Sequence, residues 1–304
     1  MNREILMMHG YPGSGKSSVA QGYIAKGFIR VNRDDIGCSL DQLVPLVEKE
    51  LAQTGRSVIL DNTYPTAESR RSMIALAKKL GIPAVALVLE TTIEDAQRNV
   101  CQRMLERHGR LVDASQMKAL KDPGLFPPTV QYHHKKVVET PTLEEGFSEI
   151  RRVPFVRRPS IHTGKGIILD YDGTLRRSKS GSKWPMSKED IEIIPGRAEV
   201  LKDLVRQGYV LCGASNQSIV SKGEISVEKM RELFDHTNKL LGVDIDVMFC
   251  PHQSHPIACF CRKPMPGMAV ALMEKHKLNS HNVLMIGDMT LSYTRRVSYT
   301  WHNC

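Results

Sequence analysis

The sequence has no long hydrophobic run and no apolar leader segment. No apolar stretch approaches the roughly 18 residues of a membrane-spanning helix, and Met1-Asn-Arg-Glu4 runs directly into the first expected strand rather than into a signal peptide. These features exclude a helical membrane protein and argue against secretion. We therefore expect a soluble protein of the cytoplasm, or of the nucleus if the source is eukaryotic.

The sequence has few acidic residues: it contains 33 Asp and Glu but 42 Lys and Arg, which gives a formal net charge of +9. Excess positive charge suits a polyanionic partner, although much of any basic surface is simply solvated. The cysteines are seven, an odd number, so a disulfide framework explains them poorly. A chain of 304 residues with 41% hydrophobic residues can bury two cores, which predicts two domains.

The most specific motif is Gly10-Tyr-Pro-Gly-Ser-Gly-Lys16-Ser17, a glycine and four residues followed by Gly-Lys-Ser. An apolar run precedes it and a helical pattern follows, which is the context of a phosphate-binding loop (P-loop). Backbone N–H groups can converge there on phosphate oxygens, Lys16 can reach the β- and γ-phosphates, and Ser17 can hold Mg²⁺. The motif predicts binding of ATP with Mg²⁺ through Gly10, Gly13, Gly15, Lys16 and Ser17.

Aspartates follow two further expected strands of this half. Asp34 and Asp35 come after residues 28–32, and Asp61 ends the strand 57–60. Ligands of open α/β sheets lie at the carboxyl ends of the strands. Asp34 or Asp35 can therefore act as a general base toward an acceptor hydroxyl, or one of them can cap the next helix. Asp61 can contact Mg²⁺ or order the site.

An arginine-rich helix is expected over residues 93–107. Arg98, Arg103 and Arg107 fall near one face, which suits a lid that clamps phosphates during transfer. Such charge runs are more often solvated faces. Arg103 is the first choice for the catalytic arginine.

Three stretches, 31–37, 59–63 and 140–155, together resemble the kinase domain of the polynucleotide kinase/phosphatase family of DNA-end repair enzymes. The resemblance covers about residues 2 to 155. It implies that Asp34 activates the 5′-hydroxyl of a nucleic acid. It also carries the family's other roles to the matching residues Lys16, Ser17 and Asp61, and that of a lid arginine to the region of Arg103. Residues 109–128 match no family feature, so the acceptor is less well defined than ATP.

A second α/β pattern follows a segment rich in proline, glycine and arginine, which we interpret as a linker over 157–165. Its first strand ends in Asp170-Tyr-Asp172-Gly-Thr-Leu, the signature of haloacid-dehalogenase-type phosphohydrolases. Two carboxylates at a strand end suit a nucleophile, Asp170, and an acid and base, Asp172. Both carboxylates and a phosphate would repel one another without a cation, which predicts Mg²⁺ near Asp170 and Asp172.

The remaining motifs of that superfamily occur in order. Ser215 ends a strand with a hydroxyl suited to a phosphate oxygen, Lys263 can offset charge on nucleophile and phosphate, and Asp288 is expected to bind Mg²⁺. About forty residues separate the first two motifs, filled by a basic loop, 176–188, and a helix, 197–207. This leaves no room for a large cap domain, so we expect a site open to the end of a polymer.

A metal-binding pattern, C-x-H-x₆-C-x-C, lies within residues 250–261, just before the lysine motif. Three thiolates and one imidazole, from Cys250, His252, Cys259 and Cys261, satisfy tetrahedral Zn²⁺ with no open position, which indicates a structural site. His255 could substitute for His252. The loop is similar to that of the histidinol-phosphate and heptose-bisphosphate phosphatases, a resemblance over about residues 164 to 290 that favours small phosphate esters.

The end of the chain departs from this pattern, because Ser292 stands where the family has a second aspartate. We hypothesise a truncated or frameshifted terminus that impairs the phosphatase.

The sequence thus predicts an α/β protein, with a P-loop kinase domain at 1–156 and a capless, Rossmann-like phosphatase domain at 166–304. The leading interpretation is an enzyme that heals nucleic-acid ends by ATP-dependent 5′-hydroxyl phosphorylation and 3′-phosphate removal through an aspartyl-phosphate. Two alternatives are a small-molecule kinase fused to a sugar- or histidinol-phosphate-type phosphatase, and a kinase with an inactive, zinc-stiffened docking domain. The sequence does not distinguish DNA from RNA, and it names no ligase or repair partner.

Overall fold

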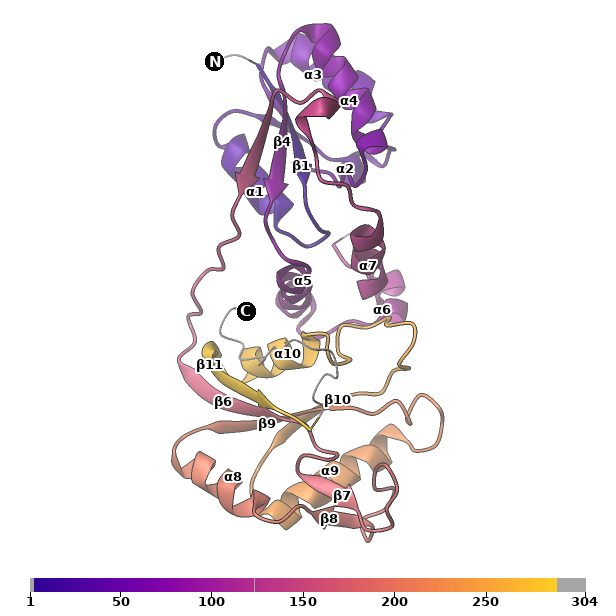
Figure 1. Ribbon diagram of the computed structural model, residues 1–304, viewed down its shortest axis with the longest axis vertical. Helices are drawn as coiled ribbons and strands as arrows, with labels where there is room; N and C mark the ends of the chain where they lie inside the picture. The colour runs from indigo at the N-terminus through magenta and orange to yellow at the C-terminus, as the bar shows by residue number, and fades with distance from the viewer. Residues whose placement is uncertain (1–2, 123, 289–304) are drawn as a thin grey trace. The chain divides into compact units, whose positions relative to one another are not determined.

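The computed structural model describes residues 3–122 and 124–288. It divides into two compact units, Met1–Val100 with Leu120–Arg157, and Cys101–Ala119 with Arg158–Cys304. Each unit is built around its own parallel sheet, as Figure 1 shows. The expected α/β class is therefore confirmed, while the domain limits 1–156 and 166–304 stay a prediction.

The first part of the chain alternates strands and helices. In order, its elements are β1 (Ile5–His9), α1 (Lys16–Ile24), β2 (Ile29–Val31), α2 (Arg33–Ile36), α3 (Leu43–Thr54), β3 (Val58–Leu60), α4 (Ala67–Leu80), β4 (Ala84–Leu89), α5 (Ile93–His108), α6 (Ala114–Leu120), α7 (Pro128–Val137), the 3₁₀ turn η1 (Leu143–Glu145) and β5 (Glu149–Val153).

The first sheet has the strand order β2-β3-β1-β4-β5, and each of its pairings is parallel. The carboxyl ends of β1, β2 and β3 therefore open on one edge of the sheet. This edge carries the P-loop after β1 and the aspartates after β2 and β3, as the sequence predicted.

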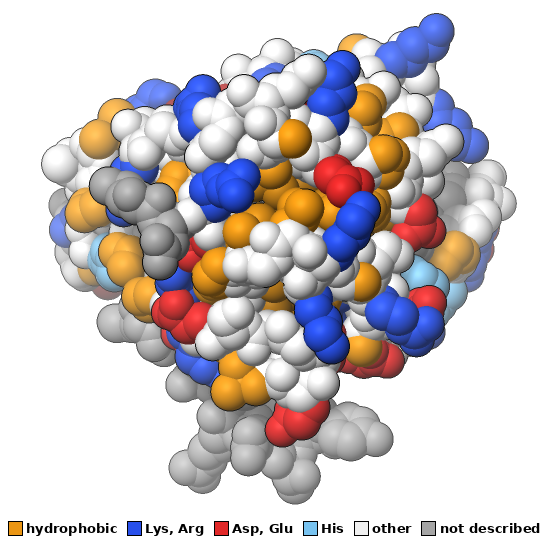
Figure 2. Space-filling model, turned by 90° about the horizontal axis from the view of Figure 1, so that it is seen from above, with side chains coloured by type: hydrophobic (Ala, Val, Ile, Leu, Met, Phe, Trp, Pro, Cys, Tyr) orange, Lys and Arg blue, Asp and Glu red, His pale blue; other side chains and the backbone are white. Residues whose placement is uncertain are grey.

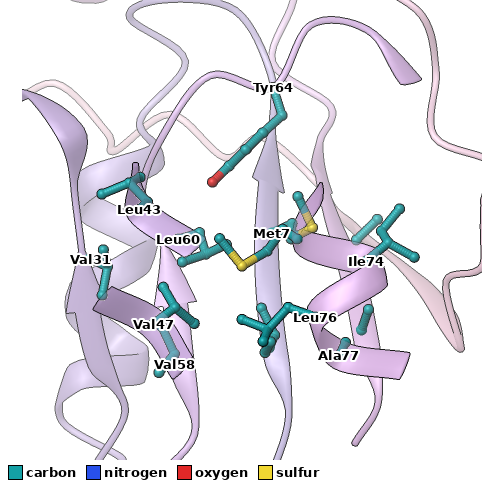
Figure 3. Close-up of a cluster of buried hydrophobic side chains, with 14 of the residues drawn as sticks. Met7, Val31, Leu43, Val47, Val58, Leu60, Tyr64, Ile74, Leu76 and Ala77 are labelled. Carbon is teal, nitrogen blue, oxygen red and sulfur yellow. The ribbon is translucent and has the colours of Figure 1, made fainter. Parts of the chain in front are cut away.

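Alternate residues of β1 enter two different cores, because successive side chains of a strand point to opposite faces. Ile5 and Met7 pack with α3 and α4 on one face (Figure 3), and Leu6 and Met8 pack with α1 on the other. A buried parallel strand is accordingly a continuous apolar run.

The second unit has the same layered plan. After the junction its elements are β6 (Gly164–Leu169), β7 (Arg176–Ser178), β8 (Ile191–Ile193), α8 (Arg197–Arg206), β9 (Val210–Asn216), α9 (Val227–Leu241), β10 (Asp246–Cys250), α10 (Gly267–Lys275) and β11 (Leu278–Ile286).

Its main sheet has the parallel order β10-β9-β6-β11. Helices α8 and α9 supply Leu201, Leu233 and Phe234 to a core on β6 and β9. The strands β7 and β8 form a separate antiparallel hairpin between the first two motifs, where the sequence predicted a basic loop. That prediction was wrong for Arg176, which is fully buried in β7.

Lys and Arg side chains lie singly on the face shown in Figure 2, with hydrophobic side chains gathered near its centre. Among the described residues, the positively charged side chains of this face are therefore scattered over it rather than gathered in one patch. Within the described residues, no helix combines the length and the apolar character that crossing a bilayer requires.

Candidate active sites and metal centre

The P-loop connects β1 to α1 and makes a tight turn that two glycines permit. Gly13 and Gly15 have φ values of +86° and +93°, a region that strains other residues. A Cβ atom at Gly13 would lie 2.7 Å from Val100 Cγ2 and 2.8 Å from the Ala96 carbonyl oxygen. The turn is therefore packed against α5 as well as strained, which explains the glycine at this position.

Lys16 begins α1, and its ammonium group lies over the loop. Lys16 Nζ donates to the carbonyl oxygens of Gly10 and Tyr11 at 3.1 and 2.9 Å. Ser17 follows on the first turn with an exposed side chain. This arrangement places a cation, a hydroxyl and a helix N-terminus at one loop, which together suit a polyphosphate and its cation.

The two aspartates after β2 have different surroundings. Asn32 caps α2 by accepting from the backbone N–H groups of Asp34 and Asp35 at 2.8 and 3.2 Å, so the cap is Asn32 rather than an aspartate. Asp35 pairs with Arg30, whose Nε also donates to Asp61 Oδ2 at 2.8 Å. The two aspartate side chains are equally exposed, at 60% and 61%, and Asp34 pairs with its neighbour Arg33 at 3.3 Å. Asp35 is joined through Arg30 to the buried Asp61, whereas the arginine that pairs with Asp34 is itself 44% exposed, so Asp34 is the less restrained of the two carboxylates.

Asp61 is almost completely buried at the end of β3, and the Arg30 ion pair compensates its charge. Arg103 lies on α5 with a partly buried side chain. Its role in a lid stays a prediction.

Two buried histidines that the sequence analysis missed stand near the P-loop. The pKa of His9, at the end of β1, and that of His134, on α7, are both lowered to about 4, chiefly by burial and in part by the charge of nearby Lys16. His9 Nδ1 lies 3.4 Å from the Tyr64 carbonyl oxygen, and the His134 ring meets Tyr11 edge-on at 5.2 Å. A single sequence does not reveal them, because an isolated histidine carries no burial signal.

These histidines predict acid sensitivity of the first unit. In the unfolded chain both would titrate near 6.5, so below that pH the unfolded state binds more protons and stability falls until about pH 4. Between pH 8 and pH 5 the expected loss is about 2 kcal/mol for each histidine. The free energy of unfolding, measured with denaturant at pH 8 and at pH 5, should show this loss. The variant His134→Gln should lose about half as much stability between the two pH values as wild type does. His133→Gln, which changes the exposed neighbour, should leave the loss intact; an equal effect of both variants would contradict the assignment.

The second site forms at the carboxyl end of β6. Lys263 Nζ lies 2.7 Å from Asp170 Oδ2, with both side chains largely buried. The side-chain amide of Asn216 holds Lys263 in place, accepting from its N–H at 2.9 Å and donating to its carbonyl at 3.0 Å. The structure thus brings together the predicted nucleophile and the predicted lysine, although 93 residues separate them in the chain.

Asp172 is held by two side chains that the sequence analysis did not assign. Arg176 Nε donates to its Oδ1 at 2.8 Å, and Gln217 Nε2 donates to its Oδ2 at 2.7 Å. The same Gln217 nitrogen donates to Ser215 Oγ at 2.9 Å. Because Ser215 Oγ accepts this bond, its own hydrogen is left to donate to a phosphate oxygen. Gln217 stands two residues after Ser215, and strand periodicity would have placed both side chains on one face.

The buried Arg176 guanidinium is anchored on α9. Its Nη1 donates to the Leu233 carbonyl at 3.1 Å and to Thr237 Oγ1 at 2.9 Å, and its plane lies near the Tyr171 and Phe234 rings. An arginine inside a basic run looks solvated in a sequence, so nothing there marked it.

Asp288 approaches the same loop from the end of β11. A Cβ atom at Gly173 would clash with Asp288 Oδ2, and one at Gly287 would lie 3.5 Å from Asp170 Cβ. These contacts bring the oxygens of Asp170 and Asp288 to one end of the sheet, and carboxylate oxygens are the ligands that Mg²⁺ prefers. Ser292 lies outside the described residues.

The four predicted zinc ligands form one cluster. Their ligand atoms all lie within 4.8 Å of one another, and Cys250, His252, Cys259 and Cys261 are the members. Cys250 Sγ is 3.5 Å from His252 Nδ1 and 3.6 Å from Cys259 Sγ, and His252 Nδ1 is 3.2 Å from Cys261 Sγ. A zinc ion with bonds of about 2.0 to 2.3 Å needs tetrahedral edges of about 3.3 to 3.8 Å. The three separations, 3.2 to 3.6 Å, lie close to this range, so the donor set fits. His255 is exposed.

Comparison with protein families identifies two domains. The family model described as "Polynucleotide kinase 3 phosphatase" matches residues 165–299, and the one described as "AAA domain" matches residues 39–123. The second match begins after the P-loop, so the loop is supported by its own geometry. A phosphatase of the first kind uses Mg²⁺ and a P-loop kinase uses ATP, so both cofactors are implied.

Among known proteins, the bifunctional polynucleotide phosphatase/kinase of Schizosaccharomyces pombe is 30% identical over 156 residues, which is 51% of this chain. The chain spans only 34% of that relative's length. The D-glycero-beta-D-manno-heptose-1,7-bisphosphate 7-phosphatase of Pasteurella multocida is 31% identical over 133 residues, 41% of this chain and 71% of the relative.

Two solved structures are similar over different shares of the chain. A D,D-heptose 1.7-bisphosphate phosphatase from B. bronchiseptica has 27% identity and a TM-score of 0.36, with 41% of this chain and 70% of that one covered. A chain of the Pnkp1/Rnl/Hen1 RNA repair complex has 16% identity and a TM-score of 0.30, with 95% of this chain and 90% of that one covered.

Proposed function

We propose that this chain, which belongs to the phosphatase family that includes the D-glycero-beta-D-manno-heptose-1,7-bisphosphate 7-phosphatases and carries a P-loop kinase domain as well, heals nucleic-acid ends. The match to the polynucleotide phosphatase model and the similarity to a bifunctional polynucleotide phosphatase/kinase support the proposal. In this proposal the first domain phosphorylates a 5′-hydroxyl with ATP, and the second removes a 3′-phosphate. Opposite reactions on one chain are useful only if they act on different groups. Ends with a 5′-hydroxyl and a 3′-phosphate supply both groups.

The observation that carries the proposal is the pairing of two complementary sites in one chain. One has a P-loop with Lys16 over it, on the sheet edge where Asp34 stays exposed. The other has the Asp170–Lys263 pair beside Asp172. A hydroxyl acceptor requires a base such as Asp34, and a phosphate ester requires a nucleophile such as Asp170.

In the phosphatase reaction, an Asp170 oxygen forms a bond to phosphorus while the bond from phosphorus to the sugar oxygen breaks. Asp172 gives a proton to the leaving oxygen and later takes one from the water that releases phosphate from Asp170. Arg176 and Gln217 donate hydrogen bonds to the two oxygens of Asp172 and so fix the orientation of the carboxyl group that transfers the proton to the leaving oxygen.

In this proposal the phosphate group is bound by a hydroxyl, a lysine and a metal ion. Ser215 donates to a phosphate oxygen, and Lys263 balances negative charge on the phosphate and the nucleophile. Mg²⁺ held by Asp170 and Asp288, beside Asp172, would neutralise the charge of carboxylates and phosphate.

In the kinase reaction, Asp34 takes the proton of the 5′-hydroxyl as that oxygen attacks the γ-phosphorus of ATP and the bond to the β-phosphate oxygen breaks. Asp61 lies near the cation in this proposal. The loop residues that would hold the phosphates and Mg²⁺ are Gly10, Gly13, Gly15, Lys16 and Ser17.

The metal cluster has a structural part in the proposal. Cys250, His252, Cys259 and Cys261 would hold Zn²⁺ with no position left for a substrate. The ion would stiffen the loop that leads to Lys263.

The kinase half is tested with labelled ATP and an oligonucleotide that has a 5′-hydroxyl. Asp34→Asn removes the proposed base without changing shape, so the rate of label transfer should fall about a hundredfold or more. Asp35→Asn is the matched control, because Asp35 already pairs with Arg30. It should lower the rate less than about tenfold. Equal rates for wild type and Asp34→Asn would rule out Asp34 as the base.

A second candidate is a small-molecule kinase fused to a sugar-phosphate phosphatase. The match to a heptose-bisphosphate phosphatase over 71% of that enzyme's length favours it. The two candidates differ in their dependence on salt, since phosphate-backbone contacts give steep slopes. A higher kcat/KM for a 3′-phosphorylated oligonucleotide than for a heptose bisphosphate, and oligonucleotide binding that weakens steeply with salt, would support end healing. A higher kcat/KM for the heptose bisphosphate would support the small-molecule function instead.

A further inference from the structure

Side chains hold the P-loop backbone from outside the loop. The carbonyl oxygen of Pro12 accepts from Gln131 Nε2 at 2.8 Å, and that of Ser14 accepts from Thr91 Oγ1 at 2.9 Å. In each peptide group the N–H points opposite to the C=O. Fixing the carbonyls of Pro12 and Ser14 on one side of the loop backbone therefore directs the N–H groups of Gly13 and Gly15 to the opposite side.

The peptide between these two is fixed in the same way. Asn99, on α5, donates from Nδ2 to the carbonyl oxygen of Gly13 at 3.0 Å. Gly13 has a φ of +86°, and a glycine allows its peptide groups to rotate with little steric cost. If the Gly13 carbonyl turned toward a bound phosphate, it would place a partial negative charge beside an anion. The Asn99 hydrogen bond opposes this rotation from one side of the peptide group, and the Ser14 N–H of the same group, which donates to the Tyr11 carbonyl at 3.0 Å, opposes it from the other.

Asn99 can donate only if its amide is oriented correctly, and Arg157 decides the orientation. Arg157 Nη1 donates to Asn99 Oδ1 at 3.1 Å. A guanidinium has no acceptor, so the amide oxygen must face it, and the NH₂ group then faces Gly13. Arg157, which the sequence analysis interpreted as part of a linker, thereby orients the Asn99 amide that binds the P-loop backbone.

Arg157 is itself held in place. Its Nη2 pairs with Asp95 Oδ1 at 2.8 Å, with side-chain exposures of 21% and 14% for the two residues, and its guanidinium lies 5.0 Å from the Phe155 ring. Asp95 stands one turn before Asn99 on α5. Asp95, Arg157 and Asn99 therefore form a hydrogen-bonded series that ends at the Gly13 carbonyl.

We propose that Arg157 and Asn99 are positioning residues for the nucleotide, which keep the Gly13 carbonyl turned away from the phosphates. The inference rests on the proposed use of ATP by this loop, and it is independent of the acceptor. It gives a residue of the segment after β5 a role in nucleotide affinity, without contact with the nucleotide.

The decisive variant is Asn99→Asp in the full-length chain. It keeps the shape and the contact with Arg157, which becomes an ion pair, but it places an oxygen rather than an NH₂ group against the Gly13 carbonyl. The dissociation constant of a fluorescent ATP analogue should rise about tenfold or more, while the thermal midpoint stays close to that of wild type. A purely structural role for Asn99 would change the midpoint and leave the affinity.

Arg157→Met supplies the second arm, since it frees the Asn99 amide to turn over, and the dissociation constant should again rise about tenfold. Arg158→Met, which removes the same charge from the exposed neighbour, is the control and should bind as wild type does. Affinities unchanged in both Asn99→Asp and Arg157→Met would overturn the inference alone. A wild-type chain that binds no nucleotide would overturn the proposed kinase and the inference with it.

Discussion

Replacing Asp170 with asparagine should lower phosphate release about a thousandfold or more, with kinase activity retained. The amide is nearly isosteric but cannot attack phosphorus, and loss of a nucleophile removes the covalent route entirely. The substitution would also abolish the ion pair with Lys263, whose Nζ is 2.7 Å from the Asp170 carboxylate in the native chain. The measurement is phosphate release from a 3′-phosphorylated oligonucleotide and from p-nitrophenyl phosphate.

The matched control for this prediction is Asp203→Asn, which changes an exposed aspartate on α8 and should leave both activities unaltered. Asp170→Asn with more than about a tenth of the wild-type rate would contradict a nucleophilic role. Wild type that releases no phosphate from either substrate would instead support the docking-domain alternative, in which the second domain has lost its activity.

Asp172 adds a test of the order of steps with the same substrates. A p-nitrophenolate group leaves with little help from an acid, whereas release of phosphate from Asp170 still needs a base. Asp172→Asn should therefore give a burst of about one nitrophenol for each site, followed by slow turnover. Phosphate should then be found on Asp170. Steady turnover without a burst would contradict the division of roles.

Replacing Cys261 with serine should be the most damaging change to the second domain. Structural zinc sites contribute folding free energy directly, and their loss costs many kcal/mol. We expect the thermal midpoint of this domain to fall by about 10 °C or more, with one equivalent of zinc lost from the purified protein. Phosphate release should fall as well, because Cys261 stands two residues before Lys263. Metal content and calorimetry measure the first two effects.

A pair of histidines in the same loop gives the internal control. His252→Ala removes a member of the cluster and should reproduce the loss of zinc. His255→Ala changes an exposed histidine and should keep zinc and stability. If His255→Ala lost the metal instead, the alternative ligand considered from the sequence would be the correct one. Protein that holds no metal, with an unaltered midpoint in Cys261→Ser, would reject the zinc site.

Motifs with local spacing were well predicted, because their chemistry depends on residues close together in the chain. The P-loop, the Asp170–Asp172 pair and the cysteine cluster each fall within a few residues of a turn or strand end. The expected α/β class followed for the same reason, since continuous apolar runs bounded by turn residues indicate buried parallel strands.

Buried partners that lie far apart in the chain and belong to no motif were not predictable. Arg176 faces Asp172, but its burial depends on Thr237 and Leu233 of α9, about sixty residues later. His134 is buried beside a loop more than a hundred residues earlier in the chain. A charged or polar residue that is buried in this way has the same local sequence as a solvated one, and only its distant partners distinguish the two.

The sequence alone determined which reactive groups this protein has and at which strand ends they lie. Tertiary structure decided how those groups are restrained: Asp35 is joined to Asp61 through Arg30, Asp172 is fixed by buried donors, and Arg157 is turned inward to Asn99. The physical reason is that reactivity belongs to a side chain and its immediate neighbours. Orientation and desolvation are set by whatever else the folded chain places within a few ångströms.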